Sequence, residues 1–376
     1  REKSKTMGNK NNAPFRADIV GSFLRPEELK KARADYQEHK ITAKELKAVE
    51  DKCITELIGK EKAAGLQCVT DGEFRHSWWH LDFFWGFEGV EYQKAEQGYK
   101  FHDEETRAES ASLSGKVRFN PNHPFFEHFT FASQVAGNEV LTKQTIPSPS
   151  QFYMALSWPG NQHAIADFYT DEEELYNDIA DAYQKSIRKF YELGCRNIQL
   201  DDCTWGMLCS REYVTADAEQ VKALQALYVR LNNEAIADLP EDLVINTHVC
   251  RGNYHSTWAG SGSYEPVAES LFAKENVHAY YLEFDTERAG GFEPLRFVPE
   301  NKHVVLGLIT SKHPQLEEKE QIKQRIQEAT QYVPLDRLYL SPQCGFASTE
   351  EGNILTEEEQ WNKVALVREI AAEVWG

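Results

Sequence analysis

Eight short apolar runs, separated by long amphipathic segments, constrain the fold of this 376-residue sequence more than any other feature. The runs are rich in β-branched, aromatic and other apolar residues, and most end in polar or small ones, as strands buried on both faces do. We therefore expect eight buried strands. They fall at residues 18–22, 66–70, 143–147, 197–200, 243–247, 279–283, 303–308 and 337–341.

The segments between these runs have the apolar spacing of helices. They cover residues 171–193, 216–237, 264–274, 316–332 and 356–375. Thr356 and Glu359 form a capping-box pattern at the start of the last helix. Eight strands alternating with helices indicate an α/β protein with a (β/α)8 barrel, the TIM barrel, although an open doubly wound sheet would give a similar pattern.

Residues 74–134 interrupt this alternation with a concentration of aromatic side chains and Gly, Asn and Pro turns. We interpret the segment as a partly β insertion after the second strand, folded over one mouth of the barrel. Its rings could line a ligand cleft, but packing of the insertion's own core is the simpler interpretation. Residues 1–15 are polar and basic and are expected to be a disordered lead-in to a single catalytic barrel at residues 16–376.

The composition limits the possible partners and the location of the protein. The formal net charge is −19, and an acidic surface repels nucleic acid and anionic lipid. No apolar stretch reaches the roughly 20 residues needed to span a bilayer, and no signal peptide opens the chain. Seven scattered cysteines indicate reduced thiols and a cytoplasmic protein. The oligomeric state cannot be read from the sequence.

Potential metal ligands occur at the ends of three predicted strands. The fifth strand leads to His248 and Cys250, the sixth ends at Glu283, and the eighth leads to Cys344. Each residue alone could be an ordinary core or surface residue, but functional groups of a parallel barrel meet at the carboxyl ends of its strands. Thiolate, imidazole and carboxylate donors in this mixture suit Zn²⁺, and a carboxylate beside two thiolates is more typical of a catalytic than of a structural zinc site.

This set of residues resembles the catalytic domain of the cobalamin-independent methionine synthase family. The resemblance rests on His248 and Cys250, on Glu283, and on Cys344 followed by glycine. It extends over nearly the whole chain from about residue 17. Supporting matches lie at residues 19–23, 71–73, 199–202 and 307–313.

The resemblance implies a reaction and a role for each matching residue. His248, Cys250, Glu283 and Cys344 would bind zinc, which takes the sulfur of homocysteine. The methyl group would come from methyl-tetrahydrofolate or another carrier, giving methionine. Val20, Gly21 and Ser22 would hold the carboxylate of the amino acid, and Glu73 and Asp201 its amino group. His313 would donate a proton, so that His313 and Asp201 are the expected catalytic residues.

Several positions depart from the pattern of that family. Arg251 and its successors replace an aromatic-Ser run, Gln343 replaces an aspartate, and residues 202–205 differ from the usual Glu-Pro-Ala. The sequence also matches only one of the family's two barrels. Two alternatives therefore stay open. One is alkyl transfer to or from another thiol, such as coenzyme M, and the other is a non-catalytic barrel that binds zinc or thiols.

Overall fold

The core of the protein is a curled parallel sheet of seven strands in the order β1-β6-β7-β8-β11-β12-β13. The computed structural model describes residues 13–94, 100–101, 104–105, 109–209, 217–251, 253–254, 257–258 and 262–376. The sheet strands are β1 (Cys68–Val69), β6 (Leu141–Pro147), β7 (Asn197–Asp202), β8 (Val244–Val249), β11 (Ala279–Glu283), β12 (His303–Ile309) and β13 (Leu338–Pro342). Nearly all of their residues are buried, as the apolar runs predicted.

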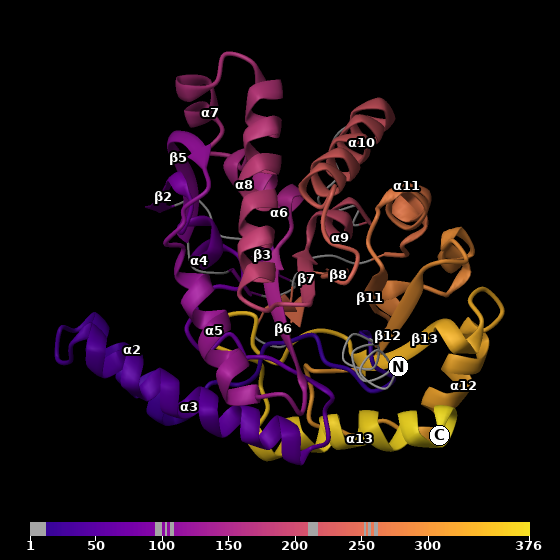
Figure 1. The fold of residues 1–376 in the computed structure, drawn as a ribbon. Coiled ribbons are helices and arrows are strands. Elements are labelled where there is room, and N and C mark those ends of the chain that lie inside the picture. The colour runs from indigo at the N-terminus through magenta and orange to yellow at the C-terminus, as the bar shows by residue number, and fades with distance from the viewer. Residues whose placement is uncertain are drawn as a thin grey trace, which may run out of the picture.

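Helices surround this sheet, and Figure 1 shows them arranged around the strands. The described α-helices are α2 (Glu27–Gln37), α3 (Ala43–Ala63), α4 (Leu81–Phe84), α5 (Pro124–Ala136), α6 (Pro149–Leu156), α7 (His163–Phe168), α8 (Glu172–Glu192), α9 (Thr204–Cys209), α10 (Ala218–Ala235), α11 (Ala268–Lys274), α12 (Lys319–Ala329) and α13 (Glu357–Trp375). Short 3-10 turns lie at η1 (Glu265–Val267), η2 (Glu287–Ala289), η3 (Glu293–Phe297) and η4 (Leu335–Arg337). The expected capping box is present, because Thr356 accepts from Glu359 N and the Glu359 side chain accepts from Thr356 N.

The alternation of strands and helices is confirmed, but the predicted strand at residues 18–22 is wrong. This part of the chain forms a single parallel bridge between Ala17 and Leu340 of β13, and Phe23 N donates to Gly72 O beyond β1 at 3.2 Å. It thus fills the gap between the first and last strands of the barrel. Gly21 has φ of 149°, a left-handed conformation that a strand does not adopt and that favours glycine.

The insertion between β1 and β6 contains an antiparallel hairpin of β2 (Glu88–Lys94) and β5 (Glu109–Arg118). Smaller antiparallel pairs join β3 (Lys100–Phe101) to β4 (Glu104–Glu105) and β9 (Asn253–Tyr254) to β10 (Thr257–Trp258). Aromatic rings of the insertion pack onto neighbouring helices: Phe84 stacks on Phe152 of α6 with ring centroids 4.7 Å apart, and Phe126 meets Phe190 of α8 at 5.0 Å. Most of these rings therefore belong to the core.

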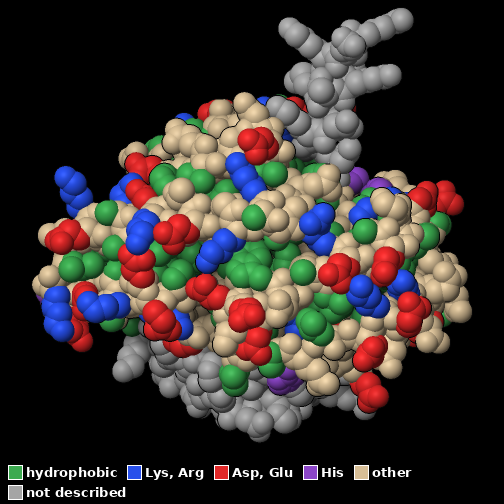
Figure 2. All heavy atoms as spheres, turned by 90° about the horizontal axis from the view of Figure 1, so that it is seen from below, with side chains coloured by type: hydrophobic (Ala, Val, Ile, Leu, Met, Phe, Trp, Pro, Cys, Tyr) green, Lys and Arg blue, Asp and Glu red, His purple; other side chains and the backbone are tan. Residues whose placement is uncertain are grey.

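The outer surface mixes charges of both signs. Figure 2, which shows the face seen from below in Figure 1, has acidic and basic side chains interspersed around apolar ones. Ion pairs such as Lys60–Glu357 and Lys319–Glu369 join neighbouring helices. In the described part of the chain, no helix combines the length and apolarity needed to cross a membrane. All seven cysteines are buried and unbridged, as expected for reduced thiols.

Replacing Thr356 with alanine tests how the last helix of the barrel is anchored. Thr356→Ala removes the side-chain acceptor for Glu359 N, which leaves an N–H group at the helix start without its partner. We expect the free energy of unfolding to fall by about 1 kcal/mol, as measured by urea denaturation. Glu358→Ala, an exposed change in the same turn, is the control, and equal effects of both changes would contradict the capping role.

Candidate metal centre and adjoining cavity

The register of the sheet brings the predicted site residues to one mouth of the barrel. Asp201 of β7 is paired with His248 of β8, which is paired in turn with Tyr281 of β11. Glu283, the last residue of β11, lies two positions beyond Tyr281 and therefore on the same face of the strand. Cys250 directly follows β8, and Cys344 lies two residues beyond the end of β13.

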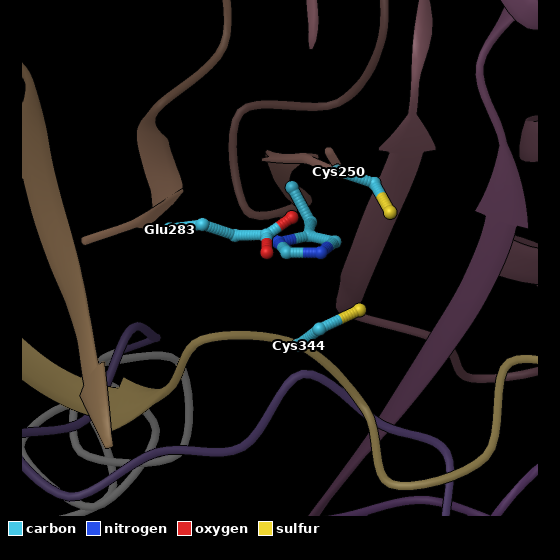
Figure 3. Close-up of side chains that lie close together, drawn as sticks. Cys250, Glu283 and Cys344 are labelled. Carbon is cyan, nitrogen blue, oxygen red and sulfur yellow. The ribbon is translucent and has the colours of Figure 1, made fainter. Parts of the chain in front are cut away.

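The predicted zinc ligands converge. Ligand atoms of His248, Cys250, Glu283 and Cys344 all lie within 4.8 Å of one another, and all four residues are buried. Figure 3 shows the side chains of Cys250, Glu283 and Cys344 pointing toward one another. The four residues predicted as a set therefore lie together in the structure.

Gly307 of β12 permits this close approach. A Cβ atom at this position would lie 2.6 Å from Leu282 O and 2.7 Å from the Cα atom of Gln343. These contacts are too short for any side chain. The residues immediately before Glu283 and Cys344 therefore pack against bare backbone, which allows the two ligand-bearing segments to approach each other.

His248 is oriented as a metal-binding histidine would be. Its Nδ1 lies 3.3 Å from the carbonyl oxygen of Tyr281, whereas its buried Nε2 makes no hydrogen bond within the described residues. A ring that donates from Nδ1 leaves the lone pair of Nε2 available to a cation. Burial lowers the pKa of this imidazole, but the neighbouring Cys250, Asp201 and Glu283 outweigh burial and raise it to about 8.

Three thiols cluster at the mouth of the barrel. Cys203, which follows β7, packs with Cys250 and Cys344. Hydrogen bonds from Cys203 and Cys344, together with the nearby His248, hold the pKa of Cys250 well below its ordinary value despite burial. Cys250 is therefore the member of the cluster that is most readily ionised, and an ionised thiol is the form that binds metal.

Hydrogen bonds hold both the side chain and the backbone of Glu283. Its Oε2 accepts from Arg251 N at 2.5 Å. The hydroxyl of Tyr264 accepts from Glu283 N at 2.8 Å and donates to Glu283 O at 3.1 Å. Outer hydrogen bonds of this kind orient a ligand and help determine affinity for the metal.

A small cavity of about 20 Å³ adjoins this quartet, which is room for about one water molecule. Of the predicted substrate-binding residues, Val20, Ser22, Glu73 and Asp201 line it. The full lining is Val20, Ser22, Glu73, Trp79, Asp201, His248, Cys250, Cys344, Gly345 and Ser348. Gly21 lies between two lining residues, while His313 is exposed between β12 and α12 and is not part of the wall.

Glu73 holds an unusual conformation inside the cavity wall. Its φ is 63°, and strained backbone in a non-glycine residue is commonly found at functional sites. Oε1 accepts from the Thr145 hydroxyl at 3.2 Å, whereas the buried Oε2 has no hydrogen-bond partner among the described residues. Burial, reinforced by the charge of Asp201, raises the pKa of Glu73 to about 8. Burial also raises the pKa of Asp201 to about 6.

Sequence reasoning missed three residues of this site. Trp79 and Ser348 line the cavity, but neither lies at the end of a predicted strand. Trp79 N donates to Ser348 O at 3.0 Å, which joins the insertion to the segment after β13. Cys203 was visible as a strand-end cysteine, and its place beside Cys250 could have been suspected from the parallel register alone.

Replacing Glu73 with glutamine tests the cost of a buried carboxyl group. The raised pKa means that the folded protein binds a proton more tightly than the unfolded chain, so stability is lost as pH rises from about 4.5 to about 8. Glutamine does not ionise, and we expect Glu73→Gln to raise the Tm by about 2–4 °C at pH 8 and by little at pH 5. Thermal denaturation without substrate measures this difference. The exposed change Glu358→Gln is the control, and a gain independent of pH would contradict the interpretation.

Comparisons with known proteins agree on one family. Residues 165–372 match the family model described as the catalytic domain of the cobalamin-independent synthase. YxjH of Bacillus subtilis, described as uncharacterized, is 46% identical over 367 residues, covering 96% of this chain and 95% of that protein. A methionine synthase of Saccharolobus solfataricus is 23% identical over 333 residues, covering 87% and 86% of the two chains.

Two solved structures resemble the fold closely. A Listeria monocytogenes protein, described as a candidate vitamin-B12-independent methionine synthase, is 42% identical with a TM-score of 0.78, covering 97% of this chain and 99% of that one. A B12-independent methionine synthase of Shewanella is 19% identical with a TM-score of 0.72, covering 96% and 97%. At that identity the second match supports the barrel fold alone.

Proposed function

Because the chain belongs to the family of cobalamin-independent synthase catalytic domains, we propose that it transfers a methyl group to the thiol of homocysteine, forming methionine. The donor is a methylated folate or another methyl carrier. The observation that carries this proposal is the convergence of four metal-ligating side chains beside two buried carboxyl groups. A cation would satisfy the four metal-ligating side chains. The amino group of an amino acid with a free thiol would satisfy the two carboxyl groups.

The residues present fit zinc. One imidazole nitrogen, two sulfurs and one carboxylate oxygen form a donor set that zinc accepts, and the buried Nε2 of His248 lacks a hydrogen-bond partner in the described part of the chain. Bound there, zinc would keep the substrate thiol in its nucleophilic thiolate form at neutral pH. His248 is held for this role by Tyr281 O, and Glu283 by Arg251 N.

The cavity wall supports recognition of the amino acid. Glu73 and Asp201 are both buried in this wall, and burial raises the pKa values of both carboxyl groups. The ammonium group of homocysteine would place a positive charge beside them and favour the ionised form of Glu73. Val20, Gly21 and Ser22 would bind the carboxylate from the adjoining segment. The cavity of about 20 Å³ is smaller than the proposed substrate, so binding would require movement of wall residues such as Trp79 and Ser348.

His313 is proposed to protonate the leaving group of the methyl donor. It follows the carboxyl end of β12 and is exposed, so it lies at the mouth, where a large donor has access, rather than in the thiol cavity. A tertiary amine of a folate is a poor leaving group until it gains a proton, and a nearby imidazole can supply one.

The alternative acceptor, a sulfonate thiol such as coenzyme M, fits this cavity less well. Its sulfonate would replace the ammonium group beside Glu73 and Asp201, so that three anionic groups would meet in a buried place. A barrel that only binds zinc or thiols would need the quartet but has no use for the two carboxyls. Methyl-transfer assays with homocysteine and with coenzyme M distinguish both alternatives from the main proposal.

Metal analysis of two cysteine variants tests the proposed zinc site. We expect about one zinc per chain in the parent protein and loss of most of it in Cys344→Ser, because one of four ligands is removed. Cys203→Ser is the matched control, since this thiol packs in the same cluster but lies outside the quartet. Elemental analysis after dialysis gives the stoichiometry. Equal zinc content in all three proteins would exclude Cys344 as a ligand.

A methyl-transfer assay tests the reaction itself. The parent protein is given homocysteine with mono- or polyglutamylated methyl-tetrahydrofolate or with methylcobalamin, and methionine is measured by mass spectrometry. We expect methionine with at least one donor, and a kcat about 100-fold lower in His313→Gln with zinc content unchanged. Methylation of coenzyme M but not of homocysteine would support the alternative, and full activity of His313→Gln would remove this residue from catalysis.

A further inference from the structure

A lysine lies inside the barrel beneath the cavity, where charged side chains are rare. The side chain of Lys143 on β6 is fully buried. Its ammonium group donates to Ile19 O at 2.6 Å and to Gln199 Oε1 at 2.9 Å. It also lies 3.6 Å from the buried Asp18 carboxylate and 4.5 Å from the centre of the Tyr281 ring.

The lysine determines which way the Gln199 amide points. An ammonium group can only donate hydrogen bonds, so the oxygen of the amide must face Lys143 and its nitrogen must face away. The nitrogen donates to Val20 O and to Asp201 Oδ1, both at 2.8 Å. A single side chain thus connects the two segments that bear these residues, and both Val20 and Asp201 line the cavity.

The segment at residues 16–23 needs such support, because it is not a strand. Its backbone lacks a regular ladder, and side chains from the neighbouring strands take over: Lys143 binds Ile19 O, Gln199 binds Val20 O, and Thr70 Oγ1 binds Gly21 O at 2.5 Å. These three consecutive carbonyl groups are fixed one after another from inside the barrel.

Stability alone does not explain this arrangement. Transfer of an ammonium and a carboxylate from water into a protein interior is costly, and an apolar pair of similar volume is often as stable or more so. The polar interior is therefore better explained by the geometry that it imposes on the cavity above it.

We infer that Lys143 and Gln199 are positioning residues for the amino-acid substrate. They hold Val20 on the carboxylate side and Asp201 on the ammonium side at a fixed separation, without touching the substrate. This inference rests on the proposed function, since it takes the cavity to be the site of an amino acid with a thiol.

Isosteric variants of Gln199 test this role. Gln199→Met removes both functions of the amide. Gln199→Glu keeps the acceptor toward Lys143 but removes the donor to Val20 and Asp201. Isothermal titration of the zinc-loaded proteins compares homocysteine with 4-mercaptobutanoate, which is the same thiol acid without the amino group. We expect both variants to lose about tenfold of the parent's preference for homocysteine in this titration. In the methyl-transfer assay, KM for homocysteine should rise more than kcat falls. The zinc content should stay unchanged.

Two further variants separate positioning from general stability. Tyr339→Phe removes a part-buried hydroxyl that bonds His303 and leaves the hydrogen bonds of Lys143 and Gln199 in place, and it should leave the preference unchanged. Lys143→Met should act like the Gln199 variants, and if it fails to fold, the Gln199 pair decides. A lower Tm with the preference intact in both Gln199 variants would overturn the inference. A parent protein that does not distinguish the two thiols would overturn the proposed function, and the inference with it.

Discussion

The burial of acidic groups at the barrel mouth is the constraint on which the site depends. Glu73 and Asp201 line the cavity together with three members of the quartet, namely His248, Cys250 and Cys344. Burial raises the pKa values of both cavity carboxyls, while hydrogen bonds from neighbouring thiols lower that of Cys250. A cation and a positively charged substrate group at this mouth would favour the ionised forms of these acidic groups, which burial alone disfavours.

The charged groups below the cavity, in contrast, have partners within the protein. Lys143 and Asp18 satisfy each other and their neighbours within the barrel, with Tyr281 donating to Asp18 at 2.7 Å. The charged groups of this lower layer have partners without a ligand. In the cavity above them, Glu73 Oε2 and His248 Nε2 have no hydrogen-bond partner among the described residues. A satisfied polar layer is rigid, because each of its groups has a partner that would be lost on movement. The barrel thus places an electrostatically incomplete site on a rigid support, which is the arrangement that selective binding requires.

The sequence predicted the features that depend on residues close together in the chain. The seven strands of the parallel sheet and the Thr356 cap follow from apolar periodicity and helix-start chemistry, and the quartet follows from ligand residues at strand ends. The segment at residues 16–23 could not be predicted, because its carbonyl groups are bound by side chains about 50 to 180 positions away. Trp79 was not predicted for the same reason. It reaches the site through a backbone hydrogen bond to Ser348, and the periodicity of the sequence does not indicate such a contact.

The insertion and the segment after β13 meet at the wall of the cavity. Trp79 N donates to Ser348 O at 3.0 Å, and Glu350 N donates to Ser77 O at 3.1 Å, so two segments far apart in sequence are joined across the cavity. The proposed substrate, homocysteine, is larger than this cavity of about 20 Å³, so its binding would require these segments to move. In the proposed reaction, the methyl donor would have to approach the substrate sulfur from outside the cavity. The contact between the insertion and the segment after β13 therefore borders the path that both proposed reactants would take.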